Sequence, residues 1–321
     1  MSEKVYPIPT ALNALVLILQ IGSFACIVYL TSIANGWWQV LALMAAMAVV
    51  GNSIYSSIHE AEHGMLHPNR RVNDFLGAVM ALLFPAPYHL IRQGHLGHHR
   101  RNRTDEEAFD LYFDGDHAWW RKLILYGIIS GFYWWLVVLS NVAVLIAPFA
   151  FKRRFFEFDR PSAAFMDALN PRFFWLIQLE AVAAIVLHGM IVNVLDIPLL
   201  KYSVVYFGFG FAWSAMQYVH HFDTQRDVLN GARNLQFISW IDWVWLHHNW
   251  HLAHHQRPNV PWFYLPKLAN VDSGKRESLV WHYLRMWRGP RYSATRMPLN
   301  GTTPAGSPID LSLSKNAHTN V

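Results

Sequence analysis

Residues 37–58, WWQVLALMAAMAVVGNSIYSSI, form an uncharged run that continues directly into HEAEHG at residues 59–64. At about 1.5 Å per residue, a helix of this length crosses a hydrocarbon core of roughly 30 Å. His59 and His63 are four residues apart, so they lie on one face of such a helix, one turn from each other. The stretch therefore predicts a membrane-spanning helix that carries two imidazoles to the lipid boundary.

Three other uncharged or nearly uncharged stretches have a similar length: residues 11–32, 173–195 and 198–219. The short turns at 33–36 and 196–198 join the four stretches into two hairpins. The second hairpin contains ionisable residues, which are costly in lipid and point either to function or to interhelical and interfacial partners. Both interpretations stay open for these residues, which are Glu180, His188 and Lys201.

The composition supports a membrane protein with a metal site. Hydrophobic residues make up 53% of the 321 residues and charged residues 15%, against about 25% charged in soluble domains. The single cysteine, Cys26, excludes a disulfide framework and any site that needs several thiolates. Of 18 histidines, most stand in tight groups, namely 59, 63 and 67; 95, 98 and 99; 220 and 221; 247, 248, 251, 254 and 255.

The distribution of basic residues predicts the orientation. The two hairpin turns contain no Lys or Arg, whereas the opposite ends of the spans are rich in both. By the positive-inside rule that face is cytoplasmic, so both hairpins deliver their histidine ends to the cytoplasmic side. Two apolar stretches stay open. Residues 74–91, broken by Pro85 and Pro87, lie in the interface or dip in and return; residues 123–151 lie in the membrane plane or cross twice.

These observations predict an all-α fold: a polytopic membrane helical bundle of two transmembrane hairpins and interfacial helices, with a cytosolic histidine-rich cap. Residues 1–292 are expected to form a single integral-membrane domain. Residues 293–321, rich in Ser, Thr, Asn, Gly and Pro, are expected to be a disordered tail. The paired tryptophans at 37–38, 119–120 and 134–135 are interpreted as interfacial belts.

Two further segments repeat the pattern H-x-x-H-H, at residues 95–99 and 251–255. Offsets of three and four place the histidines on one side of a helix, and the adjacent pair in each pattern can serve two different metals. Eight or nine histidines suit two ions and exceed the roughly three protein ligands of a hydrolytic zinc. Imidazole does not by itself identify the metal. Breaking an unactivated C–H bond with dioxygen needs a redox metal, and two irons share the electrons. Soluble di-iron bundles use glutamate-rich sites instead.

With HEAEHG at 59–64, RQGHLGHHR at 92–100 and HNWHLAHHQRPNVPW at 248–262, the chain resembles the membrane fatty-acid desaturase/hydroxylase superfamily over roughly residues 11–290. The resemblance implies a di-iron centre, dioxygen as co-substrate, and an external electron donor of ferredoxin, rubredoxin or cytochrome type with its reductase. It implies metal ligation by His59, His63, His95, His98, His99, His251, His254 and His255. It also implies one more histidine after a later span, either His220 or His221, of which we prefer His221.

The implied function is a fatty acid desaturase acting on a fatty-acyl lipid at a bacterial inner membrane, with the metals on the cytoplasmic side and no nucleic-acid partner. Alternatives within the superfamily are a fatty-acid hydroxylase, a terminal-alkene-forming oxidative decarboxylase, and a carotenoid-type hydroxylase or ketolase. An alternative from another class is a zinc hydrolase, since His59-Glu60-x-x-His63 also fits the HExxH pattern. His67, His247 and His248 are not required by the superfamily pattern. Several acids could orient imidazoles or be solvated charges, and both readings stay open for Glu62, Glu106, Glu107, Asp110, Asp223 and Asp242.

Overall fold

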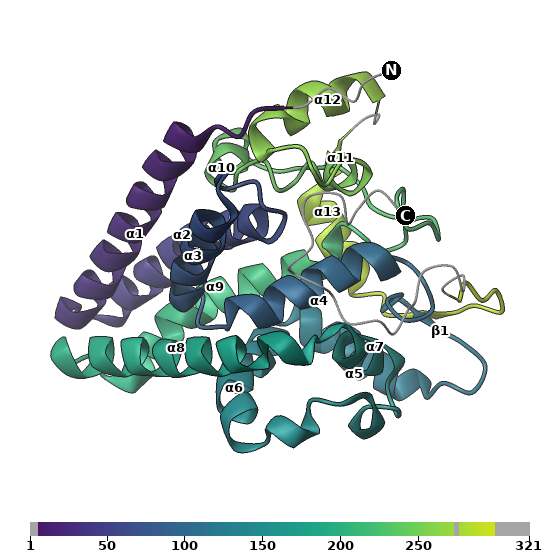
Figure 1. Cartoon of the computed structure of the whole chain (residues 1–321), viewed down its shortest axis with the longest axis horizontal. Helices are drawn as coiled ribbons and strands as arrows, with labels where there is room; N and C mark the ends of the chain where they lie inside the picture. Colours follow the sequence, from purple (N-terminus) through teal and green to yellow (C-terminus); the bar gives the residue numbers. More distant parts are fainter. Residues whose placement is uncertain (1–5, 273–275, 299–321) are drawn as a thin grey trace.

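A computed structural model describes residues 6–272 and 276–298, and in this part of the chain nearly all regular structure is helical (Figure 1). The helices are α1 (Thr10–Ile33), α2 (Trp37–Glu62), α3 (Arg70–Leu83), α4 (Tyr88–Arg101), α5 (Ala118–Ile129), α6 (Phe132–Ile146), α7 (Arg160–Ala168), α8 (Phe174–Val194), α9 (Leu199–Val219), α10 (Ser239–Val244), α11 (His251–Gln256), α12 (Leu265–Asp272) and α13 (Leu279–Met286). The short 3-10 helices are η1 (Pro148–Ala150), η2 (Arg153–Phe155), η3 (Pro171–Phe173) and η4 (Trp262–Tyr264), and the strands are β1 (Leu111–Tyr112), β2 (Leu235–Gln236), β3 (Glu277–Ser278) and β4 (Arg291–Tyr292).

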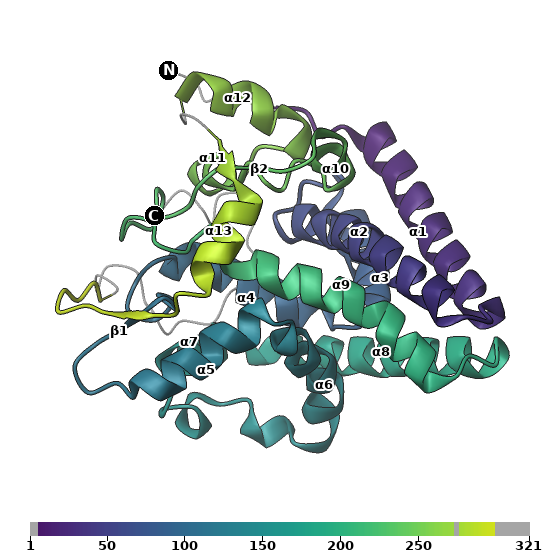
Figure 2. The ribbon, with the colours of Figure 1, turned by 180° about the vertical axis from the view of Figure 1, so that it is seen from behind.

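The predicted hairpins are present as α1–α2 and α8–α9, and their helices project from one side of the molecule (Figures 1 and 2). Three helices are long and apolar enough to cross a membrane: Thr10–Ile33, Trp37–Glu62 and Pro171–Val194. The fourth predicted span, α9, is not among these three. Much of α9 is buried, because its glycines, tyrosines and other side chains pack inside the bundle. The predicted all-α polytopic bundle is therefore confirmed, with α9 as its inner helix.

Two segments whose path the sequence left open are sharply bent. Helices α3 and α4 meet at 103° across residues 84–87, and α5 and α6 meet at 88° across Ser130 and Gly131. Each pair is apolar enough to count as one broken span or a re-entrant loop. Gly131 allows the second bend, because its φ is 89° and a Cβ there would lie 2.9 Å from the Cα of Phe211. Residues 123–151 thus contain a sharp bend between α5 and α6, and their path relative to the membrane stays a prediction.

Helices α2 and α9 form the largest helix contact of the bundle and approach each other through glycines. A Cβ on Gly208 of α9 would lie 2.3 Å from the carbonyl oxygen of Met44 on α2. A Cβ on Gly51 of α2 would lie 2.4 Å from the ring of Phe209. Small residues allow the backbones of membrane helices to come this close. The tight contact fixes the histidine ends of α2 and α9 relative to each other.

The ionisable residues of the second hairpin have interhelical partners. Glu180 accepts hydrogen bonds from the backbone N–H of His89 at 3.0 Å and from its Nδ1 at 2.6 Å. His188 bonds the hydroxyl of Tyr202 at 2.6 Å, and Lys201 donates to a carbonyl of the α1–α2 turn at 2.7 Å. Buried polar groups in a bundle need such partners. These contacts favour the structural interpretation of all three residues.

The cap contains α10–α13 and two parallel two-stranded sheets, β1–β4 and β2–β3. The expectation of a disordered tail from Ser293 needs correction at its start. Asp105 donates its backbone N–H to the carbonyl of Met297 at 3.0 Å, and the Met297 N–H returns to the Asp105 carboxylate at 2.9 Å. Pairing of β4 with β1 brings this segment against residues 105–114. Residues 299–321 lie outside the described part of the chain.

The interpretation of the tryptophan pairs as belts requires exposed rings, and Trp37 and Trp38 at the first hairpin turn are exposed. It is wrong for Trp134, which is only 2% exposed. Trp134 stacks on Tyr206 at a ring separation of 6.0 Å and packs over Gly210 of α9. A tryptophan beside a glycine of a neighbouring helix fills the space that the missing side chain leaves, so this ring belongs to the core.

Candidate metal centre

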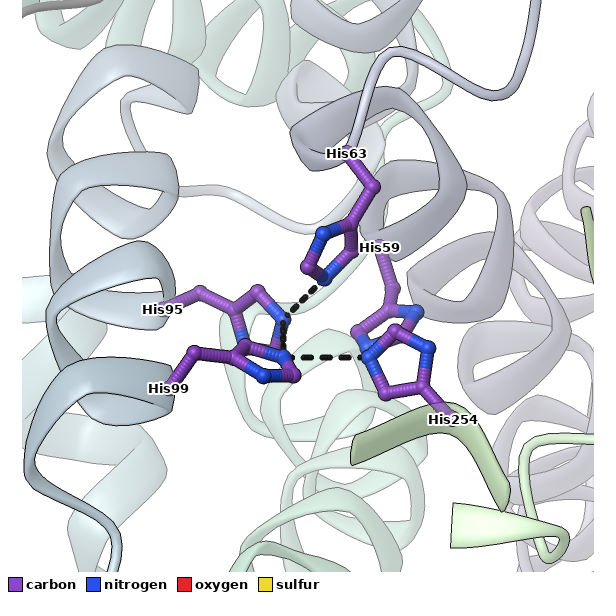
Figure 3. A group of neighbouring side chains, drawn as sticks. All are labelled: His59, His63, His95, His99 and His254. Atoms are coloured by element: carbon purple, nitrogen blue, oxygen red, sulfur yellow. Dashed lines mark hydrogen bonds between the residues drawn. The ribbon is translucent and has the colours of Figure 1, made fainter. Parts of the chain in front are cut away.

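Five histidines from three helices meet in one place, called group 1: His59, His63, His95, His99 and His254. The first two stand at the end of α2, the next two on α4, and the last on α11. Each offers a ring nitrogen, and these nitrogens lie within 4.8 Å of one another. Figure 3 shows the rings turned toward a common centre from the ribbons that surround it.

Four more histidines meet beside them as group 2: His98, His221, His251 and His255. Their ring nitrogens also lie within 4.8 Å of one another. Helices α4 and α11 contribute to both groups. The adjacent residues His98 and His99 separate, one to each group, and His254 and His255 do the same. The rings of His99 and His255 stack at 4.4 Å, so the two groups are immediate neighbours.

The nitrogen spacing fits one cation in each group. Two nitrogens bound to one metal at about 2.1 Å, with angles between about 90° and 110°, lie roughly 3.0–3.4 Å apart. In group 1 the Nε2 atoms of His99 and His254 are 3.0 Å apart, and those of His63 and His95 are slightly closer than this range, at 2.8 Å. In group 2 the Nε2 atoms of His221 and His251 are 3.0 Å apart, and those of His98 and His255 are 3.3 Å apart.

Protons alone satisfy this arrangement poorly, because a neutral imidazole has one N–H and the rings meet nitrogen to nitrogen. Nε2 of His59 is buried and has no hydrogen-bond partner among the described residues. Burial lowers the pKa of His251, His254 and His255 well below 6.5, and repulsion between neighbouring imidazoles lowers it further. These three rings are therefore neutral at pH 7, with lone pairs available for a metal. By donor type, spacing and protonation, both groups fit a metal ion.

Two rings of group 2 are held by a partner on their other nitrogen. The backbone carbonyl of Gly231 accepts from Nδ1 of His221 at 2.9 Å, which leaves the lone pair on Nε2. Nδ1 of His98 lies 2.9 Å from the carboxylate of Glu107, which also pairs with Arg101 at 3.2 Å. Burial alone would raise the pKa of Glu107, but Arg101 and His98 outweigh burial and lower it. Glu107 is thus an ionised acceptor that orients His98.

The other acids considered from the sequence do not hydrogen-bond a histidine of either group. Glu62 comes nearest, with its buried carboxylate 3.9 Å from Nδ1 of His95. Asp110 binds Arg103 and the hydroxyl of Tyr218. The remaining three have other surroundings. Asp223 pairs with arginines of the cap, and Asp242 pairs with Arg276 and Asn249. One carboxylate oxygen of Glu106 is buried without a hydrogen-bond partner among the described residues.

Of the two candidates after α9, only His221 enters a group. His220 turns to the side chain of Asn249 at 3.3 Å, and burial and repulsion from His248 lower the pKa of His220 to about 3. The His248 ring lies 4.8 Å from that of His59 without joining group 1. His247 packs on tryptophans, and the half-buried His67 bonds the Asn69 backbone. The histidines beyond the superfamily pattern thus lie outside both groups.

Glu60, which would be the general base of a zinc hydrolase, has a structural partner in the backbone. Its carboxylate is buried and accepts the backbone N–H of Trp262 at 3.1 Å. This contact ties the end of α2 to the segment that follows α11. The carbonyl of Gly231 and the link from Glu60 to Trp262 were both missed in the sequence. A backbone acceptor leaves no signal in side-chain identity, and the second link joins residues far apart in the chain.

The comparisons with known proteins agree with this geometry. A family model described as "Fatty acid desaturase" matches residues 35–292. An sn-1 oleoyl-lipid 12-desaturase from Arthrospira platensis is 24% identical to this chain over 234 residues. That match covers 64% of this chain and 60% of the relative, so the chain spans less than two thirds of the relative's length. The residues that the family model matches include every histidine of groups 1 and 2.

Proposed function

Because this chain belongs to the fatty acid desaturase family, we propose that it inserts a double bond into a fatty-acyl chain, using dioxygen and two irons held by groups 1 and 2. At the coarser level, the protein is a desaturase-like oxidoreductase of the membrane with a lipid substrate. The observation that carries the proposal is the division of nine histidines into two adjacent groups, since a single hydrolytic metal needs about three protein ligands.

Two bound irons would supply the activation of dioxygen and the removal of hydrogen from adjacent methylenes. The oxidation of a methylene pair yields two electrons, so the full reduction of dioxygen to water requires two more from outside. Within the described residues the chain offers no second cofactor domain, and we assign this supply to a ferredoxin, rubredoxin or cytochrome-type donor with its reductase. The donor would act on the cap side, which the positive-inside rule assigns to the cytoplasm, in a bacterial inner membrane.

The residues of the chain have two tasks in this proposal. Glu107 and the carbonyl of Gly231 hold imidazoles in the orientation a metal needs. An aromatic wall leads from the histidines into the bundle. Tyr55 lies with its ring 6.5 Å from that of His59, and the rings of Phe84 and Trp213 follow at 5.6 Å and 5.5 Å from Tyr55. Such a wall would exclude water and contact the apolar chain of the substrate.

Metal analysis of the purified protein tests the centre directly. We expect about two irons per chain, as two separate ligand sets imply. His254→Ala removes a nitrogen from group 1 and is expected to lower iron content and abolish turnover. His67→Ala is the matched control, because His67 lies outside both groups and bonds only a neighbouring backbone. One zinc and no iron in the wild type, or equal iron in the two variants, would refute the proposal.

Product analysis tests the reaction. The protein is expressed in a host with a working electron donor, and its lipids and headspace are analysed by mass spectrometry. An internal double bond is the expected product. A hydroxylated chain would replace desaturation by hydroxylation, and a volatile terminal alkene would replace it by oxidative decarboxylation. Activity only in a host that makes carotenoids would assign a carotenoid-type reaction instead.

A further inference from the structure

Two short helices of the cap carry an exposed aromatic face that the proposed reaction does not use. On α13 the exposed side chains recur at helical spacing, and they include Trp281 and Leu284, which are 56% and 54% exposed. The opposite side of α13 buries His282 and Met286. On α10, Trp240 is 59% exposed. The aromatic face is defined here as Ile238, Trp240, Trp243, Val280, Trp281, Leu284 and Trp287, all of which are exposed.

Both helices lie against the sides of α2 and α9, the two helices that form the largest helix contact of the bundle. Trp245, which follows α10, donates its indole N–H to the carbonyl of Val49 on α2 at 3.0 Å. Tyr283 of α13 lies edge-on to Phe211 of α9, at a ring separation of 6.2 Å. Figure 2 shows α13 beside one end of α9 and α10 beside α2.

The two contacts lie at matching depths. Val49 precedes His59 by ten residues, and Phe211 precedes His221 by ten residues. At 1.5 Å per residue, each contact is about 15 Å along the helix from the histidine end. Val49 belongs to a helix that is long and apolar enough to span a membrane. Both helices therefore contact the bundle within the length of the candidate span α2, about 15 Å from its histidine end.

The face also adjoins other exposed apolar surfaces of the bundle. The indole of Trp287 stacks on Tyr126 of α5 at 5.9 Å, and Phe207 and Phe211 of α9 are themselves exposed. Arg288 is exposed at the end of α13. Tryptophan concentrates at the boundary between headgroups and acyl chains, and arginine beside it reaches the phosphates.

We infer that α10 and α13 form a membrane-embedded foot of the cap, whose aromatic face contacts the lipids of the leaflet that lies on the histidine side. The occupant of the face is the bilayer itself, because α10 lies against α2, which is long and apolar enough to span a membrane, and α13 adjoins exposed rings of α5 and α9. An amphipathic helix in this position is stabilised by its buried apolar area. The foot holds the cap at a fixed height over the leaflet from which an acyl lipid would come.

Spin labels test this in the full-length protein in nanodiscs of phosphatidylcholine and phosphatidylglycerol. The single cysteine, Cys26, is exposed on α1, so a label there gives the reference for lipid. In a Cys26→Ala background, labels are placed by Trp240→Cys and Trp281→Cys. Leu229→Cys is the matched control, because Leu229 is an apolar residue of a cap loop and 44% exposed. Each label is compared for accessibility to dioxygen, which enters lipid, and to a water-soluble nickel chelate.

Labels at 240 and 281 are expected to give an oxygen-to-nickel accessibility ratio severalfold above that at 229 and close to that at 26. A ratio at either position equal to that at 229 overturns the inference and leaves the face to water or to a protein partner. Ile238→Cys and Val280→Cys supply second positions on the same helices if a tryptophan variant fails to fold. Retained binding of iron is the check on folding, and the ratio itself does not depend on catalysis.

Discussion

Replacing Glu107 separates the two halves of the metal centre. The carboxylate of Glu107 lies 2.9 Å from Nδ1 of His98, which belongs to group 2 only. Loss of such an outer partner typically weakens metal binding by about 10–100-fold, which is about 1.4–2.8 kcal/mol. Glu107→Gln keeps an oxygen that accepts from Nδ1 and removes the charge, so we expect the low end of this range. Glu107→Ala removes both and is expected at the high end.

The assay is iron retention against a graded chelator, with iron measured per chain. Because group 1 does not contain His98, a Glu107 variant is expected to fall from about two irons to about one in a separate first step. Glu106→Gln is the matched control, since Glu106 is the adjacent residue of the same type and its buried carboxylate oxygen has no hydrogen-bond partner among the described residues. Simultaneous loss of both irons, or a curve equal to that of Glu106→Gln, would refute the assignment of His98 and Glu107 to one separate site.

Three further predictions concern the fold, and each is read as an unfolding temperature in detergent. Gly208→Leu forces α9 away from the α2 backbone at a cost of about 1–3 kcal/mol, whereas Gly189→Leu, with nothing within 4 Å of its added Cβ, is expected to be nearly neutral. Glu180→Ala leaves His89 without its buried acceptor and should cost about 3–5 kcal/mol, with a smaller loss in Glu180→Gln; equal losses would contradict this. Burial raises the pKa of Asp116, but hydrogen bonds and nearby arginines outweigh burial and lower it below 3.8. Its stabilisation is thus present above pH 3.8 and lost as the pH falls, so the deficit of Asp116→Asn should shrink in acid.

The sequence contained most of the site because the relevant information is local. Spacings of three and four place His95, His98 and His99 on one side of α4, and the sequence predicted that the adjacent pair His98 and His99 could serve two metals. That His95 joins His99 rather than His98 is known only from the structure. The pairing of these residues with α11 is different, since it depends on how two distant helices cross. The choice between His220 and His221 depends on the end of α9 and on a carbonyl ten residues later. Neither the crossing of the two helices nor the choice between the two histidines can be deduced from residue types alone.

The sequence also did not predict which tryptophans are exposed and which are buried. The paired tryptophans were interpreted as interfacial belts, but one of them, Trp134, is buried against a glycine of α9. The exposed face of α10 and α13 is assembled from tryptophans about forty residues apart, which the parallel pairing of β2 with β3 brings into one region. Hydropathy along the chain describes a span well and describes a surface built from two short helices poorly.

The origin of each group along the chain has a consequence for biosynthesis. Four of the five histidines of group 1 lie within residues 59–99, whereas three of the four in group 2 lie within residues 221–255. Most of the histidines of group 1 are therefore translated early, before α8, α9 and the cap. Group 2 cannot be completed until residue 255 has been translated. A nascent chain stalled before residue 221 would carry four of the five histidines of group 1 and one of the four of group 2.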